Sequence, residues 1–227
     1  MGKRIVNITK DVDLAKLYAL DDAVALVKKC ATAKFDETVE LHARLGVDPK
    51  QADQLVRGTV GLPHGLGKTK KVAVVTQGDK QKAATDAGAD IVGGAELVEQ
   101  ISKGFLDFEI LVATPDMMRD LSKLGKVLGP KGLMPNPKSG TVTTDVAKTV
   151  KELKAGRVEY KVDDYGIIHV PVGKASFEPA KVAGNARAVL EALIKARPAA
   201  AKGNYLLSVT LSSTMGPGIK LDPGQKF

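Results

Sequence analysis

Strict alternation of apolar and polar residues near both ends of the chain predicts strands with one buried face. Residues 38–45 carry apolar side chains at odd positions, residues 157–162 at even positions, and residues 207–211 at odd positions. A turn at residues 163–166 leads into a further expected strand, residues 167–172. Because side chains alternate across a strand, the pattern is typical of an antiparallel sheet whose second face is wet.

Two segments of the same end regions carry apolar residues at helical spacing. Residues 22–32 and 179–196 each place an apolar stripe along one side of the expected helix. Such stripes can cover the dry face of the sheet. We therefore expect an α+β domain, with an antiparallel sheet covered by helices on one face.

The middle of the chain follows a different pattern, in which short apolar runs alternate with helical segments. The expected strands are residues 71–76, 89–92 and 108–113, and the expected helices are residues 80–87, 96–102 and 116–124, the last one capped by Thr114 and begun by Pro115. Buried runs separated by helices predict βαβ units. We expect a Rossmann-like, three-layer α/β domain with helices on both faces of a parallel sheet.

The change of pattern predicts one domain interrupted by another. Residues 1–68 and 157–227 would form the discontinuous α+β domain, and residues 69–156 the inserted α/β domain. The chain would pass between the two domains only twice, and two such connections suggest a hinge. The hinge candidates are Gly67, Lys68, Gly156 and Arg157.

Composition supports a globular chain in a reducing compartment. Hydrophobic residues make up 44% and charged residues 26%, and no apolar run is long enough to span a membrane. The first residues lack the apolar core of a signal peptide, so we expect a cytoplasmic protein. Cys30 has no companion for a disulfide, and we expect it to be a small buried hydrophobic residue rather than a reactive thiol.

Charge points to a polyanionic partner. The net charge is +8, from 34 Lys and Arg against 26 Asp and Glu, and residues 121–144 and 192–221 contain no acid. Within residues 125–140, four glycines and three prolines exclude a helix or central strand, and the lysines are Lys126, Lys131 and Lys138. This stretch is either a rigid basic loop that offers donors to phosphates or a solvated connector.

Catalytic and cofactor motifs are missing from the sequence. Residues 65–69 resemble the end of a phosphate-binding loop, but the first glycine is misplaced and a strand, not a helix, is expected to follow. His42, His64 and His169 have no metal-ligand spacing. We expect no enzyme, no cofactor and no metal. Two alternatives stay open: a small-molecule site at the strand ends near Gly78 and Gly93, and generic binding to duplex DNA.

The last alternating strand ends in a segment suited to RNA. Hydroxyls at positions 210, 212 and 214 share the outward side and could bond a ribose 2′-OH, and Met215 could pack against a sugar or base. Gly216 would permit close backbone approach. The alternative is a simple strand end with a turn. Because the chain has only five Phe, four Tyr and no Trp, any bound RNA would be recognised by folded shape more than by stacked bases.

Several motifs, in order along nearly the whole chain, resemble one ribosomal family. They are Ala33-Lys34-Phe35-Asp36-Glu37-Thr38, Arg57-Gly58-Thr59-Val60, Leu62-Pro63-His64-Gly65-Leu66-Gly67-Lys68, Gly88-Ala89-Asp90, residues 128–138, residues 171–177 and Thr214-Met215-Gly216-Pro217. The chain resembles the bacterial large-subunit ribosomal proteins that build the mobile stalk beside the transfer-RNA exit site.

The resemblance implies partners and site residues. It implies binding to large-subunit (23S) rRNA, assistance in releasing deacylated tRNA from the E site, and repression of the messenger RNA of its own operon. We expect no membrane partner and a monomer when the chain is free. Matched motifs assign RNA binding to Lys34, Phe35, Thr38, Glu40, His42, His169, Lys174, Ser176, Ser212, Thr214, Met215 and Gly216. The Thr214 hydroxyl, buried in the complex, is expected to supply selectivity.

Overall fold

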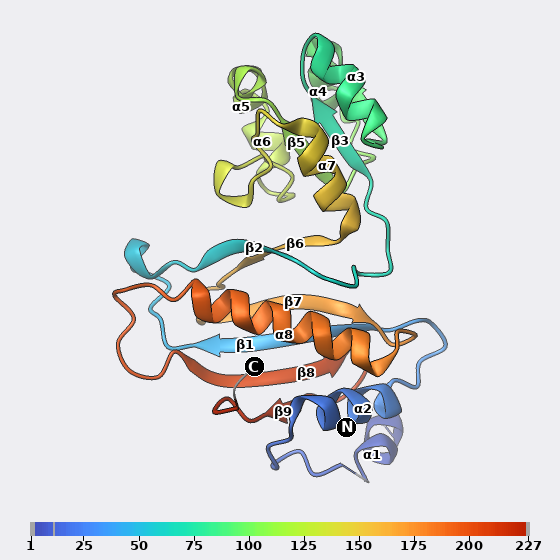
Figure 1. Cartoon of the computed structure of the whole chain (residues 1–227), viewed down its shortest axis with the longest axis vertical. Coiled ribbons are helices and arrows are strands. Elements are labelled where there is room, and N and C mark those ends of the chain that lie inside the picture. Colours follow the sequence, from blue (N-terminus) through green and yellow to red (C-terminus); the bar gives the residue numbers. More distant parts are fainter. Residues whose placement is uncertain (1–2, 11, 226–227) are drawn as a thin grey trace. The chain divides into compact units, whose positions relative to one another are not determined.

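A computed structural model describes residues 3–10 and 12–225 of the chain. The described residues group into two compact units (Figure 1). The first unit holds the chain up to Gly67 and again from Val158 onward, and the second holds Lys68–Arg157. Each unit is described by itself below.

The first unit is built on a four-stranded antiparallel sheet. Its helices are α1 (Lys3–Thr9), α2 (Leu20–Cys30), the 3-10 helix η1 (Ala52–Gln54) and α8 (Pro179–Lys195), and its strands are β1 (Thr38–Leu45), β2 (Arg57–Gly61), β6 (Arg157–Lys161), β7 (Ile167–Lys174), β8 (Leu206–Ser213) and β9 (Ile219–Leu221). The strand order is β7-β1-β8-β9, and β2 pairs separately with β6. In the register of the sheet, His42 lies opposite His169 on one side and Thr210 on the other.

Helices α2 and α8 pack against the same face of this sheet (Figure 1). The expected strand at residues 38–45 is confirmed, and its odd positions are buried in the core of the unit. The expected helix from Pro179 is confirmed, while α2 begins two residues earlier than predicted. Cys30 is 2% exposed, as expected of a small buried residue, and burial raises the pKa of its thiol.

The prediction that Leu207 faces the core is wrong, because its side chain is 48% exposed. The pairing of β1 with β8 shifts between Arg44 and Leu45, so that Leu45 lies opposite Leu206. Leu206 packs against the core in its place. A one-residue irregularity moves the following side chains to the other face, which a strict period of two cannot anticipate.

The second unit has a three-stranded parallel sheet in the order β4-β3-β5. Its elements are β3 (Val72–Val75), α3 (Asp79–Asp86), β4 (Ile91–Gly93), α4 (Ala95–Ser102), β5 (Ile110–Ala113), η2 (Pro115–Met117), α5 (Met118–Ser122), α6 (Gly125–Leu128), η3 (Pro137–Ser139) and α7 (Val146–Ala155). Ala73 and Val75 join a core cluster with residues of α4 and α5, whereas Val72 and Val74 join one with residues of α3 and α7. Helices therefore pack against both faces of the parallel sheet.

Two local predictions in this unit are wrong. The helix expected over residues 116–124 is a 3-10 turn followed by the short α5, and Thr114 makes no capping hydrogen bond with its side chain. Residues 125–140 were expected to contain no helix, but α6 spans Gly125–Leu128. This single turn precedes the first proline of the stretch, and the fully buried Leu128 anchors it to the core.

Candidate nucleic-acid interface

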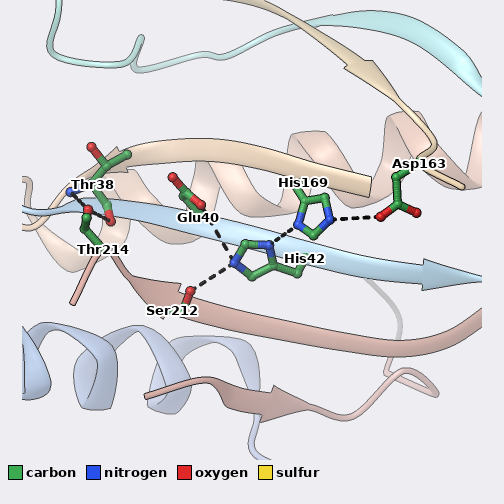
Figure 2. A network of polar contacts seen from close by, with 7 residues as sticks. All are labelled: Thr38, Glu40, His42, Asp163, His169, Ser212 and Thr214. Atoms are coloured by element: carbon green, nitrogen blue, oxygen red, sulfur yellow. Dashed lines mark hydrogen bonds and ion pairs between the residues drawn. The ribbon is translucent and has the colours of Figure 1, made fainter. Parts of the chain in front are cut away.

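The open face of the antiparallel sheet carries a connected set of polar side chains (Figure 2). His42 Nδ1 lies 2.7 Å from His169 Nδ1, and His42 Nε2 lies 2.9 Å from Ser212 Oγ. His169 Nε2 is 3.5 Å from an Asp163 carboxylate oxygen, and Glu40 is 3.9 Å from His42 Nε2. The sheet register therefore brings Glu40, His42, His169 and Ser212 together, as their assignment to one surface requires.

The contact between the two imidazoles restricts their protonation. Two ring nitrogens 2.7 Å apart need one hydrogen between them, so His42 and His169 cannot both be doubly protonated in this arrangement. Burial is the main cause that lowers the pKa of His42 below its ordinary value of 6.5, and His169 lowers it further, whereas Glu40 acts in the opposite direction. His42 is therefore held in its neutral form near pH 7.

A second set of contacts joins the start of β1 to the residues after β8. The Thr38 N–H donates to Thr214 Oγ1 at 3.0 Å, the Thr214 N–H donates to the Thr38 carbonyl at 3.0 Å, and the Thr214 hydroxyl lies 3.3 Å from that same carbonyl. Lys174 Nζ donates to Thr38 Oγ1 at 2.9 Å. The Thr214 hydroxyl thus has intramolecular partners, so its direct effect is to hold the segment after β8 against Thr38.

Two acids beside these residues were not predicted as site residues. Asp36 accepts hydrogen bonds from the Ser176 N–H at 3.0 Å and the Ser176 hydroxyl at 2.8 Å. Glu37 accepts from the Ala33 N–H at 2.8 Å and the Met215 N–H at 2.9 Å, and it is only 1% exposed. The alternation of β1 contains a signal for Glu37, because position 37 is in phase with the buried odd positions that follow it.

Exposed apolar side chains lie on the segments that these acids hold. Phe35 is 56% exposed and Met215 is 49% exposed, and Lys34 beside Phe35 is also exposed. A Cβ on Gly216 would lie 2.4 Å from Ser213 Oγ, so only glycine fits this position without a shift. The arrangement offers apolar surface, a cation and closely approachable backbone at one place.

Comparison with known proteins identifies the family of the chain. Residues 27–217 match the model of the ribosomal protein L1p/L10e family. The chain belongs to that family. It is also similar to the large ribosomal subunit protein uL1 of Solibacter usitatus (strain Ellin6076), with 59% identity over 222 residues, 97% of this chain and 93% of the relative. Membership confirms the resemblance found in the sequence.

Membership in a ribosomal protein family also settles the general role. The chain is a structural constituent of the large ribosomal subunit, which confirms the expected cytoplasmic, ribosome-associated location. A structural role in the ribosome requires no catalytic activity.

The lysines of the basic stretch lie in the second unit. Lys126, Lys131 and Lys138 are exposed, and the stretch is fixed by turns rather than extended. The Asn136 side chain accepts from the Lys138 N–H at 2.8 Å and closes the turn at Pro137. The structure therefore supports a shaped basic loop, and whether it binds phosphate stays a prediction.

The four hinge candidates lie at the boundaries between the units. Gly67 and Gly156 have φ angles of 73° and 110°, a conformation that favours glycine, and Gly156 ends α7. Lys68 and Arg157 form ion pairs within the second unit, with Glu109 and Glu152 respectively. These contacts fix the ends of the crossings to the second unit, and hinge motion stays a prediction.

The structure gives no support to a phosphate-binding loop or to a small-molecule site near Gly78. Residues 65–69 lead into β3 rather than a helix, so they cannot act as a phosphate-binding loop. A hollow of about 420 Å³ in the second unit is lined by residues of α4 and α5 with Lys123 and Leu124, and not by the strand ends near Gly78. Within residues 3–10 and 12–225, no group of three or more His, Cys, Asp and Glu could hold a metal ion, and no helix has the length and apolar character of a membrane span.

Proposed function

We propose that the first unit binds large-subunit rRNA through a surface that we call the strand-end surface: residues 33–38, 174–176 and 212–216, with His42 and His169 beside them. One observation carries the proposal. Phe35 and Met215 are both strongly exposed, although their two segments are held in place by hydrogen bonds between distant parts of the chain, from the Ser176 N–H to Asp36 and from the Met215 N–H to Glu37. Exposed apolar side chains on an ordered backbone are typical of a site that a partner covers.

The chemistry of the strand-end surface suits folded RNA. Lys34 and Lys174 offer ammonium groups to phosphates, which gives affinity that falls with salt. Phe35 and Met215 offer surface for a base or a sugar, and Gly216 lets the RNA backbone approach closely. The Nε2 of His169, which lies 3.5 Å from Asp163, adds a group that can bond a ribose hydroxyl. Both ring nitrogens of His42 are already engaged, by His169 and Ser212, so His42 orients these neighbours.

We propose that the two compact units act as separate domains. The first would be the discontinuous α+β domain that anchors the chain to rRNA, and the second the inserted Rossmann-like, three-layer domain. The division at Gly67/Lys68 and Arg157/Val158, with separate core clusters in the two units, supports this proposal. The crossings near Gly67 and Gly156 would form the hinge, and the chain would be a monomer when free.

We also propose that the chain assists release of deacylated tRNA from the E site. The exposed lysines of the second unit suit a tRNA backbone, and the family resemblance supports the assignment. Ribosomes reconstituted without this chain should release deacylated tRNA more slowly, and replacing Lys126, Lys131 and Lys138 by alanine should reproduce part of that defect. Equal release rates would contradict this role.

A further proposal is repression of the chain's own operon messenger RNA through the same strand-end surface. A messenger segment that imitates the rRNA element would compete for the same residues. Translation of a reporter that carries the operon leader should fall when wild-type protein is added and recover with Phe35→Ala. Repression by wild type and Phe35→Ala alike would show that the strand-end surface is not used.

The rRNA proposal is tested by filter binding to the stalk fragment of large-subunit rRNA. Phe35→Ala should weaken binding about tenfold or more, since one base stacked on an aromatic side chain contributes about 1–3 kcal/mol. Tyr165→Ala is the matched control, because Tyr165 is 82% exposed on the same unit but lies in the turn between β6 and β7. Equal affinity for wild type and Phe35→Ala would remove Phe35 from the site.

A further inference from the structure

Glu37 joins chain segments that are far apart in the sequence. One carboxylate oxygen accepts the Ala33 N–H at 2.8 Å, and the other accepts the Met215 N–H at 2.9 Å, across 178 positions of the chain. The main-chain carbonyl of Glu37 accepts the Ala175 N–H at 2.8 Å. One residue therefore ties together the three segments of the strand-end surface, which are residues 33–38, 174–176 and 212–216.

The Glu37 carboxylate is buried but remains ionised. Burial acts to raise the pKa of Glu37, but the N–H groups of Ala33 and Met215 outweigh it and hold the pKa below its ordinary value of 4.5. The Ser213 hydroxyl and Arg4 contribute in the same direction, although Ser213 Oγ does not reach the geometry of a full hydrogen bond. Hydrogen bonds to an ionised acceptor are stronger than those between neutral groups, so a carboxylate suits this position better than an amide.

Arg4 of α1 also holds the segment that contains Met215. One guanidinium nitrogen donates to the Met215 carbonyl, and another donates to Thr32 Oγ1 at 3.3 Å. Both peptide groups of Met215 are thus held, its N–H by Glu37 and its carbonyl by Arg4. The side chain of Met215 stays exposed while its backbone is fixed.

We propose that Glu37, supported by Arg4, is a positioning residue for RNA binding: it fixes the three segments of the strand-end surface relative to one another and does not itself contact RNA. A side chain that is 1% exposed has no surface to offer a partner. Its effect on affinity comes from pre-organisation, because segments that are already ordered lose less conformational freedom on binding. This inference rests on the proposed rRNA binding.

The test is Glu37→Gln with two measurements. The amide can accept one of the two N–H groups but presents its own donor to the other, so one segment is released. Affinity for the stalk rRNA fragment should fall about tenfold, and the slope of affinity against salt should stay unchanged because no phosphate contact is removed. Hydrogen exchange at the Ala33 and Met215 amides should accelerate, while exchange at Leu41 and Val170 in the sheet stays slow.

Glu159→Gln is the matched control, since Glu159 lies on the same unit and pairs with Arg57 away from the strand-end surface. It should leave both RNA affinity and exchange at Met215 unchanged. If Glu37→Gln does not fold, Arg4→Met takes its place, and it should accelerate exchange at Met215 and weaken RNA binding several-fold without changing the salt slope. A salt slope reduced by about 0.9 would instead make Arg4 a phosphate contact.

The outcomes separate this inference from the proposed function. If wild type binds the stalk fragment and the folded positioning variant binds equally well, Glu37 and Arg4 do not position the surface, and the inference is overturned while rRNA binding stands. If wild type itself shows no preference for the stalk fragment, the proposed function fails and the inference fails with it. Loss of affinity together with faster exchange at Met215 supports both.

Discussion

At the scale of single residues, Asn185 shows how a buried polar side chain fixes a loop of the first unit. It is fully buried in α8, donates to the carbonyls of Gly65 and Val172 at 2.9 and 2.8 Å, and accepts the His64 N–H at 3.0 Å. Asn185→Leu would remove the partner of one buried backbone group, the Val172 carbonyl, and of two partly buried ones, so the free energy of unfolding should fall by roughly 1–3 kcal/mol.

Denaturant unfolding of the full chain measures this loss, and the exposed Asn204 provides the comparison. Asn204→Leu should change the free energy of unfolding by no more than about 0.5 kcal/mol. Similar stabilities for the two variants would show that the hydrogen bonds of Asn185 do not anchor the loop.

His42 should make stability depend on pH. Its pKa in the folded chain lies below the ordinary 6.5, so between these two values the unfolded chain binds more protons than the folded one. Stability therefore falls as the pH is lowered through 6.5 towards the folded pKa. His42→Gln should reduce the loss of unfolding free energy between pH 7.5 and pH 5.5.

His64→Gln is the control for replacing a histidine outside the network, because the His64 ring lies beside Gly184 of α8. It should leave the pH dependence close to that of wild type. If the unfolding free energy of His42→Gln depends on pH as strongly as that of wild type, groups other than His42 cause the dependence.

At the scale of elements, helix α7 depends on a side-chain cap. Asp145 Oδ1 accepts the Lys148 N–H at 3.2 Å at the start of the helix. Asp145→Ala should lower the stability of the second unit by about 1 kcal/mol. Asp116→Ala, at an exposed position of η2, should have a smaller effect. Equal effects in thermal unfolding would mean that the cap of α7 contributes little.

The elements also show how far pattern alone predicts the fold. β1 and α8 were predicted closely, because each has a long buried face that imposes its period on the sequence. α1, β2 and β9 were not predicted, since they are short and too few residues repeat for a period to emerge. The ten-residue α7 was not predicted either, although Val146, Val150 and Leu153 form a buried stripe at helical spacing. The exposed position of Leu207 depends on a pairing irregularity with β1, which is a tertiary feature.

The candidate site was predicted less completely than the fold. Exposed residues such as Phe35 and Met215 were found through motif resemblance, and the structure holds their segments together through Glu37. Glu37 itself was overlooked because its partners are backbone N–H groups, which leave no pattern of residue types. Only its buried position in the alternation of β1 gave a signal.

At the scale of the whole molecule, the two units have separate hydrophobic clusters. Unfolding should therefore proceed in more than one transition, as is common when a chain has more than one domain. Asn185→Leu should shift the transition of the first unit, and Asp145→Ala that of the second. Calorimetry measures these transitions. A single transition that both variants shift would show that the two units unfold together.

The most direct test of rRNA binding compares nucleic acids with the unmodified chain. Filter binding would measure affinity for the stalk fragment of large-subunit rRNA and for a DNA duplex of equal length, across a salt series. We predict that the RNA binds more tightly by orders of magnitude at every salt concentration. The logarithm of its binding constant should fall with the logarithm of the salt concentration, with a slope of about −0.9 for each phosphate contact. Equal affinities for RNA and DNA would mean that the net charge of +8 acts only as a general attraction, and would contradict a specific rRNA site.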